Sequence, residues 1–182
     1  MITFEDIKGN GHLWAVHFEG EELNELDKVF TQWNDAGWLI QFFRKHFDDL
    51  VSYFKITKLD EAVYDTMTDS DKLECLILDI SPEANLDELF RPLENNRTSE
   101  MLLSKEKARL KNRSKHASWL RIYAIKLKPG IYVVTGGAIK LTRTMQEREH
   151  TLKELEKMEK VRQYFVENGV IDDDSFVDFI KV

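Results

Sequence analysis

The sequence is poor in cysteine and contains no stretch of apolar residues long enough to cross a membrane. Cys75 is the one cysteine among 182 residues, so an intramolecular disulfide is excluded. Its neighbours Leu73, Leu76 and Ile77 are apolar, and we expect Cys75 to be a small buried side chain. No run of about 18 apolar residues occurs, and the N-terminus lacks the basic and apolar pattern of a secretory signal. These absences predict a cytoplasmic protein that does not enter a membrane.

The sequence also lacks a convergent cluster of metal ligands. His12 and His17 lie in or beside the apolar run from Leu13 to Phe18, and no thiols or carboxylates gather around them. Protein metal sites need several such ligands together, so we interpret both histidines as strand residues. The acidic triplet 172–174 is interpreted as a helix start, where carboxylates are favoured. We therefore expect no metal and no cofactor.

Positive charge is scarce over most of the chain and is concentrated in its centre. The net charge is -7, but residues 97–148 hold 13 of the 26 lysines and arginines and only 3 of the 33 acidic residues. That segment carries a local charge of +10, against -17 for the remainder. A basic centre of this kind attracts polyanions whatever the total charge. Chance clustering, with internal pairing between acidic and basic parts, is the alternative.

The spacing of apolar residues predicts an α+β fold, and the length suits one domain over residues 1–182. The expected elements are a strand at 13–18, one or two helices over 22–46, a helix at about 59–78, a helical turn at 86–89, an extended piece at 90–94 and a helix at 146–168. Asn168-Gly169 is a typical C-terminal stop for the last of these.

The clearest signal is a β-hairpin between these elements. Its two apolar runs, 119–127 and 131–135, are joined by a Lys-Pro-Gly turn at 128–130. Along the first run, Leu120, Ile122, Ala124 and Ile125 compete for a core face, while Arg121, Tyr123 and Lys126 can project elsewhere. The alternation is imperfect near the middle of the run. A hairpin with flanking cations is also a common solubilised sheet edge, so the pattern by itself does not define a site.

The segment 95–115 is polar and basic, and its cations stand at alternate positions. They are Lys105, Lys107, Arg109, Lys111, Arg113 and Lys115. An extended chain would place all six on one face, whereas a helix would scatter them. A solvated loop or a charged helix is the alternative. We describe the segment as a basic insertion in the single domain.

The order of these elements resembles the RelE/ParE superfamily of small bacterial toxins, in particular its HigB-like, phage Gp49-like branch. The motif is an arginine within a strand, here Leu120-Arg121-Ile122-Tyr123, followed by an apolar strand, a glycine-containing turn and lysine or threonine residues, here 133–142. The resemblance covers residues 90–168 by motif and residues 1–89 by topology alone. It implies a small antiparallel or mixed sheet of about four strands with helices packed on one side, preceded here by extra N-terminal helices.

The resemblance also implies an activity. The enzymes of this superfamily are ribosome-dependent mRNA endonucleases neutralised by a cognate antitoxin, so the implied partners are mRNA on the ribosome and an antitoxin protein. Cleavage by a 2'-hydroxyl needs a proton acceptor, a proton donor and cations that stabilise the phosphorane, and it needs no metal.

Candidate residues follow from matching this sequence to the motif. Arg121, Lys140 and Arg143 match the basic positions that would stabilise phosphate charge. His150 is the histidine near this end of the fold, and its ordinary pKa of about 6.5 suits proton transfer. The candidate RNA-binding residues are Lys107, Arg109, Lys111, Arg113 and Lys115.

Other readings stay open. A RelE-fold protein without catalysis would use the same basic surface to bind nucleic acid or a protein partner, and a gyrase-poisoning branch belongs to the same superfamily. The chain is also longer than most toxins of the family. Its acidic N-terminal part could fold over the basic face, either as a structural pad or in place of an antitoxin.

Overall fold

A computed structural model describes residues 1–79, 85–93, 102–111 and 115–182 of the chain. The elements are β1 (Ile2–Asp6), β2 (Leu13–Phe18), α1 (Glu25–Trp33), α2 (Ala36–Lys45), α3 (Phe47–Phe54), α4 (Leu59–Asp79), α5 (Leu86–Leu89), β3 (Phe90–Pro92), β4 (Ser104–Ala108), β5 (Leu120–Leu127), β6 (Ile131–Ile139), the 3-10 turn η1 (Met145–Glu147), α6 (Glu149–Glu167) and α7 (Asp173–Lys181). The described part of the chain has no helix that is long and apolar enough to cross a membrane.

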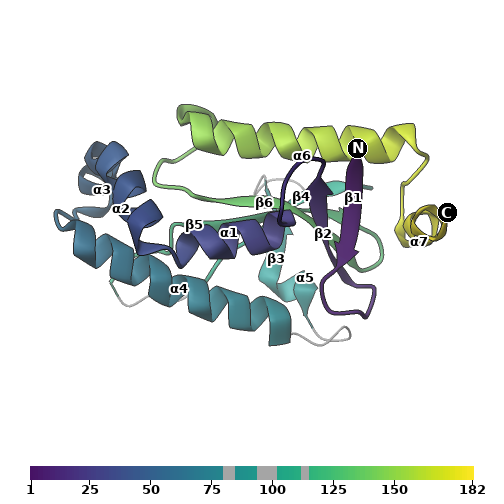
Figure 1. Cartoon of the computed structure of the whole chain (residues 1–182), viewed down its shortest axis with the longest axis horizontal. Helices are drawn as coiled ribbons and strands as arrows, with labels where there is room; N and C mark the ends of the chain where they lie inside the picture. The colour runs from purple at the N-terminus through teal and green to yellow at the C-terminus, as the bar shows by residue number, and fades with distance from the viewer. Residues whose placement is uncertain (80–84, 94–101, 112–114) are drawn as a thin grey trace.

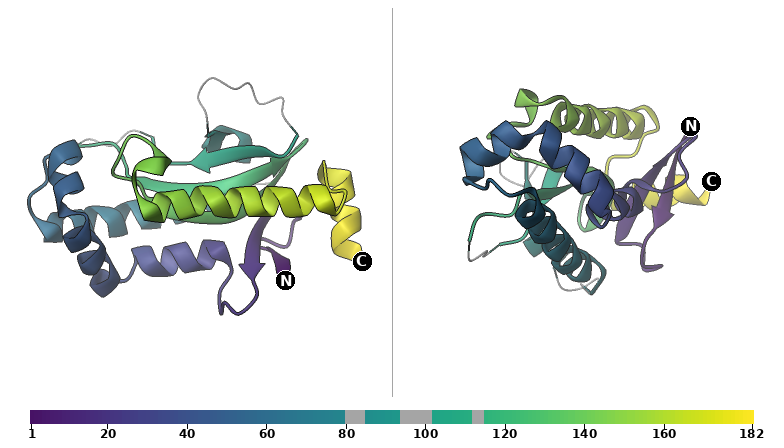
Figure 2. Two further views of the ribbon diagram at one scale, coloured as in Figure 1. Left: turned by 90° about the horizontal axis from the view of Figure 1, so that it is seen from above. Right: turned by 60° about the vertical axis from the view of Figure 1, so that its left-hand side comes forward.

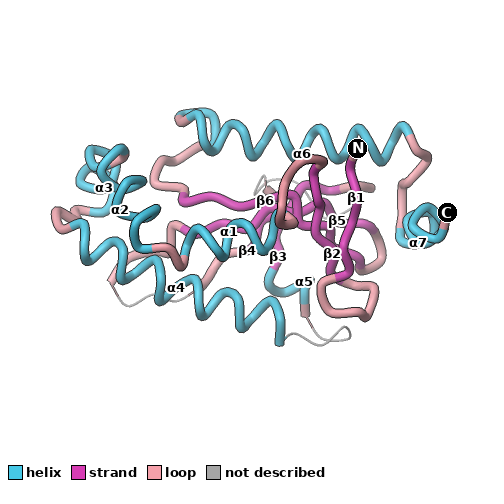
Figure 3. The backbone as a smooth tube through the Cα atoms, viewed as in Figure 1, coloured by secondary structure: helices cyan, strands magenta, loops and turns pink. Residues whose placement is uncertain are grey.

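The strands form one mixed sheet, which confirms the α+β class. Their order is β1-β2-β6-β5-β4-β3, with β2 parallel to β6 and all other neighbours antiparallel (Figure 3). The sheet has six strands where about four were expected. The additional strands are β1, a short ITFED segment, and β4, whose sequence SKEKA is polar. Pairing holds them in place, because β1 lies along β2 and β4 lies between β3 and β5.

Helices cover both faces of this sheet, so the expectation of helices on one side is wrong. Helices α1 to α4 lie on one face, α6 crosses the other, and α7 lies near one end (Figure 1). Along β5, Leu120 and Ile122 pack toward α1 to α4, whereas Ile125 and Leu127 pack toward α6. A strand that is apolar on both faces is typical of a sheet that is covered by helices on both sides. This explains the imperfect alternation of apolar and polar residues in the hairpin sequence.

In helix α4, apolar neighbours in the sequence do not make a residue buried. It is continuous from Leu59 to Asp79, and Leu73 and Ile77, one turn apart, are both fully buried. Cys75 lies between them on the opposite side of the helix and is exposed, not buried as expected.

Two glycines of β6 bring α1 and α6 close to the sheet. Gly136 faces α6, and a β-carbon there would lie 2.0 Å from a carboxylate oxygen of Glu154. Gly137 faces α1, and a β-carbon there would lie 2.7 Å from the Arg121 carbonyl oxygen and 3.2 Å from Trp33. The register shifts beside them, since Tyr123 pairs with Gly136 and the next residue of β5 pairs with Val134.

The close contact at Gly137 generates a stability prediction. Gly137→Ala should lower the free energy of unfolding by about 1–3 kcal/mol, because the added methyl meets backbone and buried side chains. Gly130→Ala is the matched control, since open space surrounds that position, and it should change stability by about 0.5 kcal/mol or less. Chemical denaturation measures both; equal losses would contradict the account.

Candidate functional site

Strand register gathers cations on the α6 face of the sheet. Lys107 of β4 pairs with Tyr123 of β5, and Arg121 of β5 pairs with Ala138 of β6. Directly paired residues share a face, and residues two apart along a strand also share it. Lys107, Arg121 and Tyr123 therefore project to the same side. Lys126, which the sequence pattern grouped with Arg121 and Tyr123, instead lies beside Asp87 and Tyr132 on the opposite face.

These side chains line a cleft with a volume of about 920 Å³. It lies between β4 and β5, the segment that follows β6, and one side of α6. The teal and green strands extend past α6 in the first view of Figure 2, so the helix covers only part of this face. The basic side chains of the cleft are Lys105, Lys107, Arg109, Arg121, Lys140, Arg143 and Arg162.

One end of the cleft is neutralised by a carboxylate. Glu159 of α6 lies 2.5 Å from the Lys105 ammonium and 3.4 Å from the Arg162 guanidinium. Leu103 and Leu155 add apolar lining to the cleft. Leu103 has a φ of 55°, a left-handed conformation that is costly for a leucine.

The remaining cations have no carboxylate partner within the described residues. Arg121 donates to the carbonyl oxygens of Ser118 and Leu120, at 2.6 and 2.9 Å. Lys140 donates to two carbonyl oxygens at 3.1 and 2.7 Å, and Lys107 donates to one at 3.3 Å. Carbonyl groups satisfy these donors without neutralising their charge. The cleft lining holds seven cationic side chains against two carboxylates, Glu156 and Glu159, so it favours an anion.

Burial and repulsion between neighbouring cations both lower the pKa values of cationic residues in the cleft. Burial is the main cause that lowers the pKa of Arg121 to about 10, with the nearby Arg109 charge adding to it. Burial and the charge of Arg121 likewise lower the pKa of Lys107 and of Lys140. A bound anion would relieve both effects. Arg121 still carries its charge at neutral pH.

The structure brings together most of the cations that the sequence analysis selected. Arg121, Lys140, Arg143, Lys107 and Arg109 all line the cleft. The alternate spacing of the basic segment also holds on β4, whose extended backbone aligns Lys105 with Lys107.

Two other candidates do not line the cleft, and one cannot be placed. The Lys111 ammonium lies 3.5 Å from the Glu88 carbonyl oxygen, and Lys115 is exposed. Arg113 lies outside the described residues. The segment 95–115 is in part the strand β4, so this part of it is integral to the sheet and does not interrupt it.

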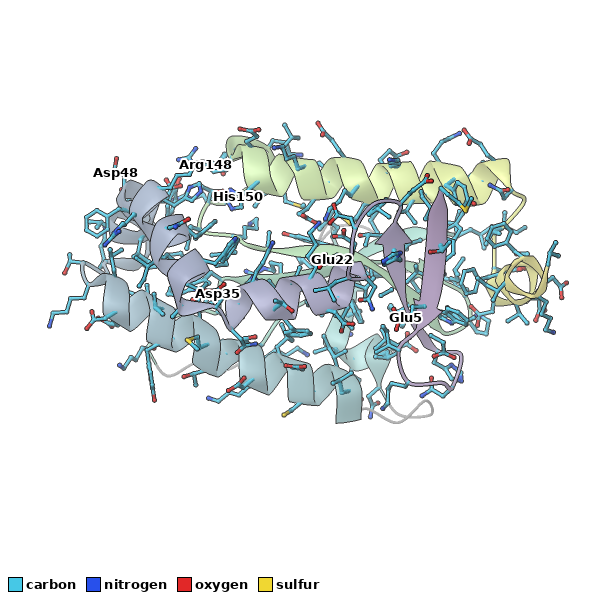
Figure 4. The ribbon with its side chains drawn as sticks, viewed as in Figure 1. Glu5, Glu22, Asp35, Asp48, Arg148 and His150 are labelled. Carbon is cyan, nitrogen blue, oxygen red and sulfur yellow. The ribbon has the colours of Figure 1, made fainter. Side chains whose placement is uncertain are left out.

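His150 also lies away from the cleft. It is in the first turn of α6, where its Nε2 donates to the Ile139 carbonyl oxygen at 2.8 Å. Its ring centre is 4.7 Å from that of His46 and 5.1 Å from that of Phe42. Figure 4 shows His150 beside Arg148, near the helices α2 and α3. The proton-transfer candidate therefore does not line the cleft that holds the cations, although it binds the carbonyl group of the residue before Lys140.

This histidine pair belongs to a polar contact between α6 and α3. Arg148 binds both carboxylate oxygens of Asp49, at 2.7 and 2.6 Å. Burial, followed by the charge of His150, lowers the pKa of His46 to about 4. Burial also lowers the pKa of His150. These groups hold the end of α6 against the N-terminal helices.

The acidic N-terminal helices do not cover the basic cleft. Among the described residues, the cleft lining begins at Pro92, and α1 to α4 pack on the opposite face of the sheet. The hypothesis that this part folds over the basic face is therefore wrong, because its apolar faces are used to bury the other side of β5 and β6.

Arg162 lines the cleft but was not among the site residues selected from the sequence, and neither was Tyr123. Tyr123 lines the cleft, it is 0 % exposed, and its hydroxyl has no hydrogen-bond partner among the described residues. The position of Tyr123, two residues after Arg121 on a strand, is the sequence signal that could have identified it, because such residues share a face. No group of three or more potential metal ligands comes together in the parts of the chain described above.

Comparison with known proteins does not extend these observations. A scan against protein-family models, a search of curated proteins and a search of solved structures each found no match. The candidate site therefore rests on its own geometry.

The histidine pair generates a prediction for pH dependence. The pKa of His46 falls from 6.5 to about 4 on folding, so the unfolded chain binds a proton in that window that the native state does not. Stability should fall as pH drops through the window. His46→Gln should show a weaker pH dependence of melting temperature between pH 7 and 4.5.

The comparison between wild type and variant isolates His46. Glu154, whose pKa is raised to about 7 by burial, acts in the opposite direction over this range and is present in both proteins. His17→Gln is the matched control, because its ring lies on β2, away from the pair. Identical pH profiles for His46→Gln and wild type would contradict this assignment.

Proposed function

We propose that this protein is an mRNA endonuclease of the RelE/ParE toxin type, which grips RNA phosphates in the cleft beside α6. The observation that carries the proposal is the cluster of Lys107, Arg109, Arg121 and Lys140, which lack carboxylate partners in the described part of the chain. Repulsion among these like charges destabilises the unliganded protein, and a bound anion reduces that repulsion. The phosphates of RNA supply such an anion.

The proposed chemistry is the attack of a ribose 2'-hydroxyl on the adjacent phosphorus. The bond from the 2'-oxygen to phosphorus forms and the bond to the 5'-oxygen breaks, which gives a 2',3'-cyclic phosphate and a 5'-hydroxyl. Arg121 supports the negative charge that develops on the phosphorane. Lys107 and Lys140 line the same cleft; one of them, in its neutral form, would accept the 2'-hydroxyl proton, and the other, in its charged form, would protonate the leaving 5'-oxygen.

The proposed partners are mRNA on the ribosome and a cognate antitoxin. Because the cleft is open beside α6, a protein that covers it could neutralise the activity. Its contacting segment would be acidic, since the uncovered side chains there are cationic.

Binding without cleavage is the second candidate function. The position of His150 favours it, since the ring lies with His46 and Phe42, away from the cations of the cleft. In this reading Arg121 and its neighbours hold an RNA or another polyanion, and no bond is broken.

Phosphate binding can be tested through salt dependence. Arg109 is exposed and lines the cleft, so Arg109→Gln should weaken binding of a 2'-O-methyl RNA oligonucleotide by about tenfold or less. It should also reduce the slope of log affinity against log salt by about 0.7. Fluorescence anisotropy measures both quantities.

Lys153→Gln is the matched control for the salt experiment. Lys153 is an exposed lysine of α6 that pairs with Glu149 and does not line the cleft. It should leave the slope unchanged. Equal slopes for wild type and Arg109→Gln would remove the support for RNA binding in this cleft.

Catalysis can be tested in cells and on translated mRNA. Induced expression should arrest growth, and Lys107→Gln or Lys140→Gln should relieve the arrest while Lys153→Gln does not. With translating ribosomes, the wild type should yield fragments with 5'-hydroxyl ends, and a 2'-O-methyl group at the cleaved nucleotide should abolish that cut. Intact mRNA together with normal RNA binding would overturn the endonuclease and leave the binding function.

A further inference from the structure

Tyr123 is buried at the cleft, and its hydroxyl has no partner in the part of the chain that the structure describes. It lies at the centre of β5, where it pairs with Lys107 on one side and Gly136 on the other. It lines the cleft, is 0 % exposed, and makes no hydrogen bond through its hydroxyl to any described residue. Buried hydroxyl groups in folded proteins are usually hydrogen-bonded, so this one needs an explanation.

The other fully buried tyrosine of the sheet provides a contrast. Tyr132 of β6 is 1 % exposed on the opposite face, and its hydroxyl donates to the Asp87 carboxylate. The fold thus supplies an acceptor for one buried tyrosine and leaves the other facing a cleft. Burial also raises the pKa of Tyr123, so its hydroxyl keeps its proton and can donate.

The nearby side chains do not supply the missing acceptor. Arg121, which projects to the same side, and Lys107, the register partner, are both donors. Glu154 of α6 lies over Gly136 and binds Lys157 through one carboxylate oxygen at 2.8 Å. Its second oxygen is buried and forms no hydrogen bond with Tyr123 or with any other described residue, although the charge of Glu154 adds to burial in raising the pKa of Tyr123. The surroundings are rich in donors and positive charge, which favours an acceptor that enters from the cleft and carries negative charge.

We propose that Tyr123 donates a hydrogen bond to a non-bridging phosphate oxygen of the RNA, which Arg121 and Lys107 hold at the same time. This inference rests on the proposed function and adds to it a neutral donor within the cationic cluster. A neutral donor adds a directed contact without further charge repulsion. Tyr123 is thereby a residue that contacts the substrate.

The experiment compares two buried tyrosines on opposite faces of one sheet. Tyr123→Phe keeps the ring and removes the orphan hydroxyl, so the melting temperature of the free protein should be unchanged or higher. Its affinity for a 2'-O-methyl RNA oligonucleotide should fall by about 10- to 100-fold, as expected for a lost hydrogen bond to a charged group. Tyr132→Phe should lower the melting temperature and keep RNA affinity within about twofold of wild type.

The two measurements separate the possible outcomes. The proposal is supported if Tyr123→Phe binds RNA more weakly while its melting temperature is not lowered. A purely structural role would lower the melting temperature together with the RNA affinity. Normal RNA binding by Tyr123→Phe overturns the inference and leaves the proposed RNA-binding function intact. A wild type that binds no RNA overturns both.

Discussion

The approach of two helices to opposite faces of β6 is the contact on which the rest of the structure depends. Gly136 leaves space for the Glu154 carboxylate of α6, and Gly137 leaves space for Trp33 of α1. Without β-carbons at these positions, both helices reach the strand directly. The sheet is therefore enclosed on two sides, and its two central strands become the most buried part of the chain.

This enclosure determines where charge can be placed. Arg121 is only 9 % exposed, yet it lies on a strand whose other residues are largely apolar. Its charge is tolerated because α6 leaves the β4 side of the sheet uncovered, so a cleft reaches the guanidinium. Lys107 and Lys140 share this opening, and burial followed by the charge of Arg121 lowers the pKa of both. The fold thus concentrates positive charge where burial strengthens its electrostatic effect.

Much of the helical structure could be predicted from local sequence. The periodic apolar residues of α6 predicted the helix, and Asn168-Gly169 predicted its C-terminal end. In the structure the helix ends at Glu167, with Asn168 as its cap. β4 was the difficult case, because its five residues SKEKA have little intrinsic preference for a strand. Its backbone is extended because β3 and β5 supply hydrogen-bond partners on both sides. Pairing between distant segments is not encoded in any local pattern.

The sequence by itself determined the basic centre of an acidic chain and the hairpin, because composition and two apolar runs joined by a turn are local properties. Only the tertiary structure decided which cations share a cleft. It packed His150 against His46, outside the cleft lining, and placed the acidic helices on the opposite face. It also left the Tyr123 hydroxyl without a partner in the described chain. Such outcomes depend on which faces the helices bury, and that follows from the packing of the whole fold.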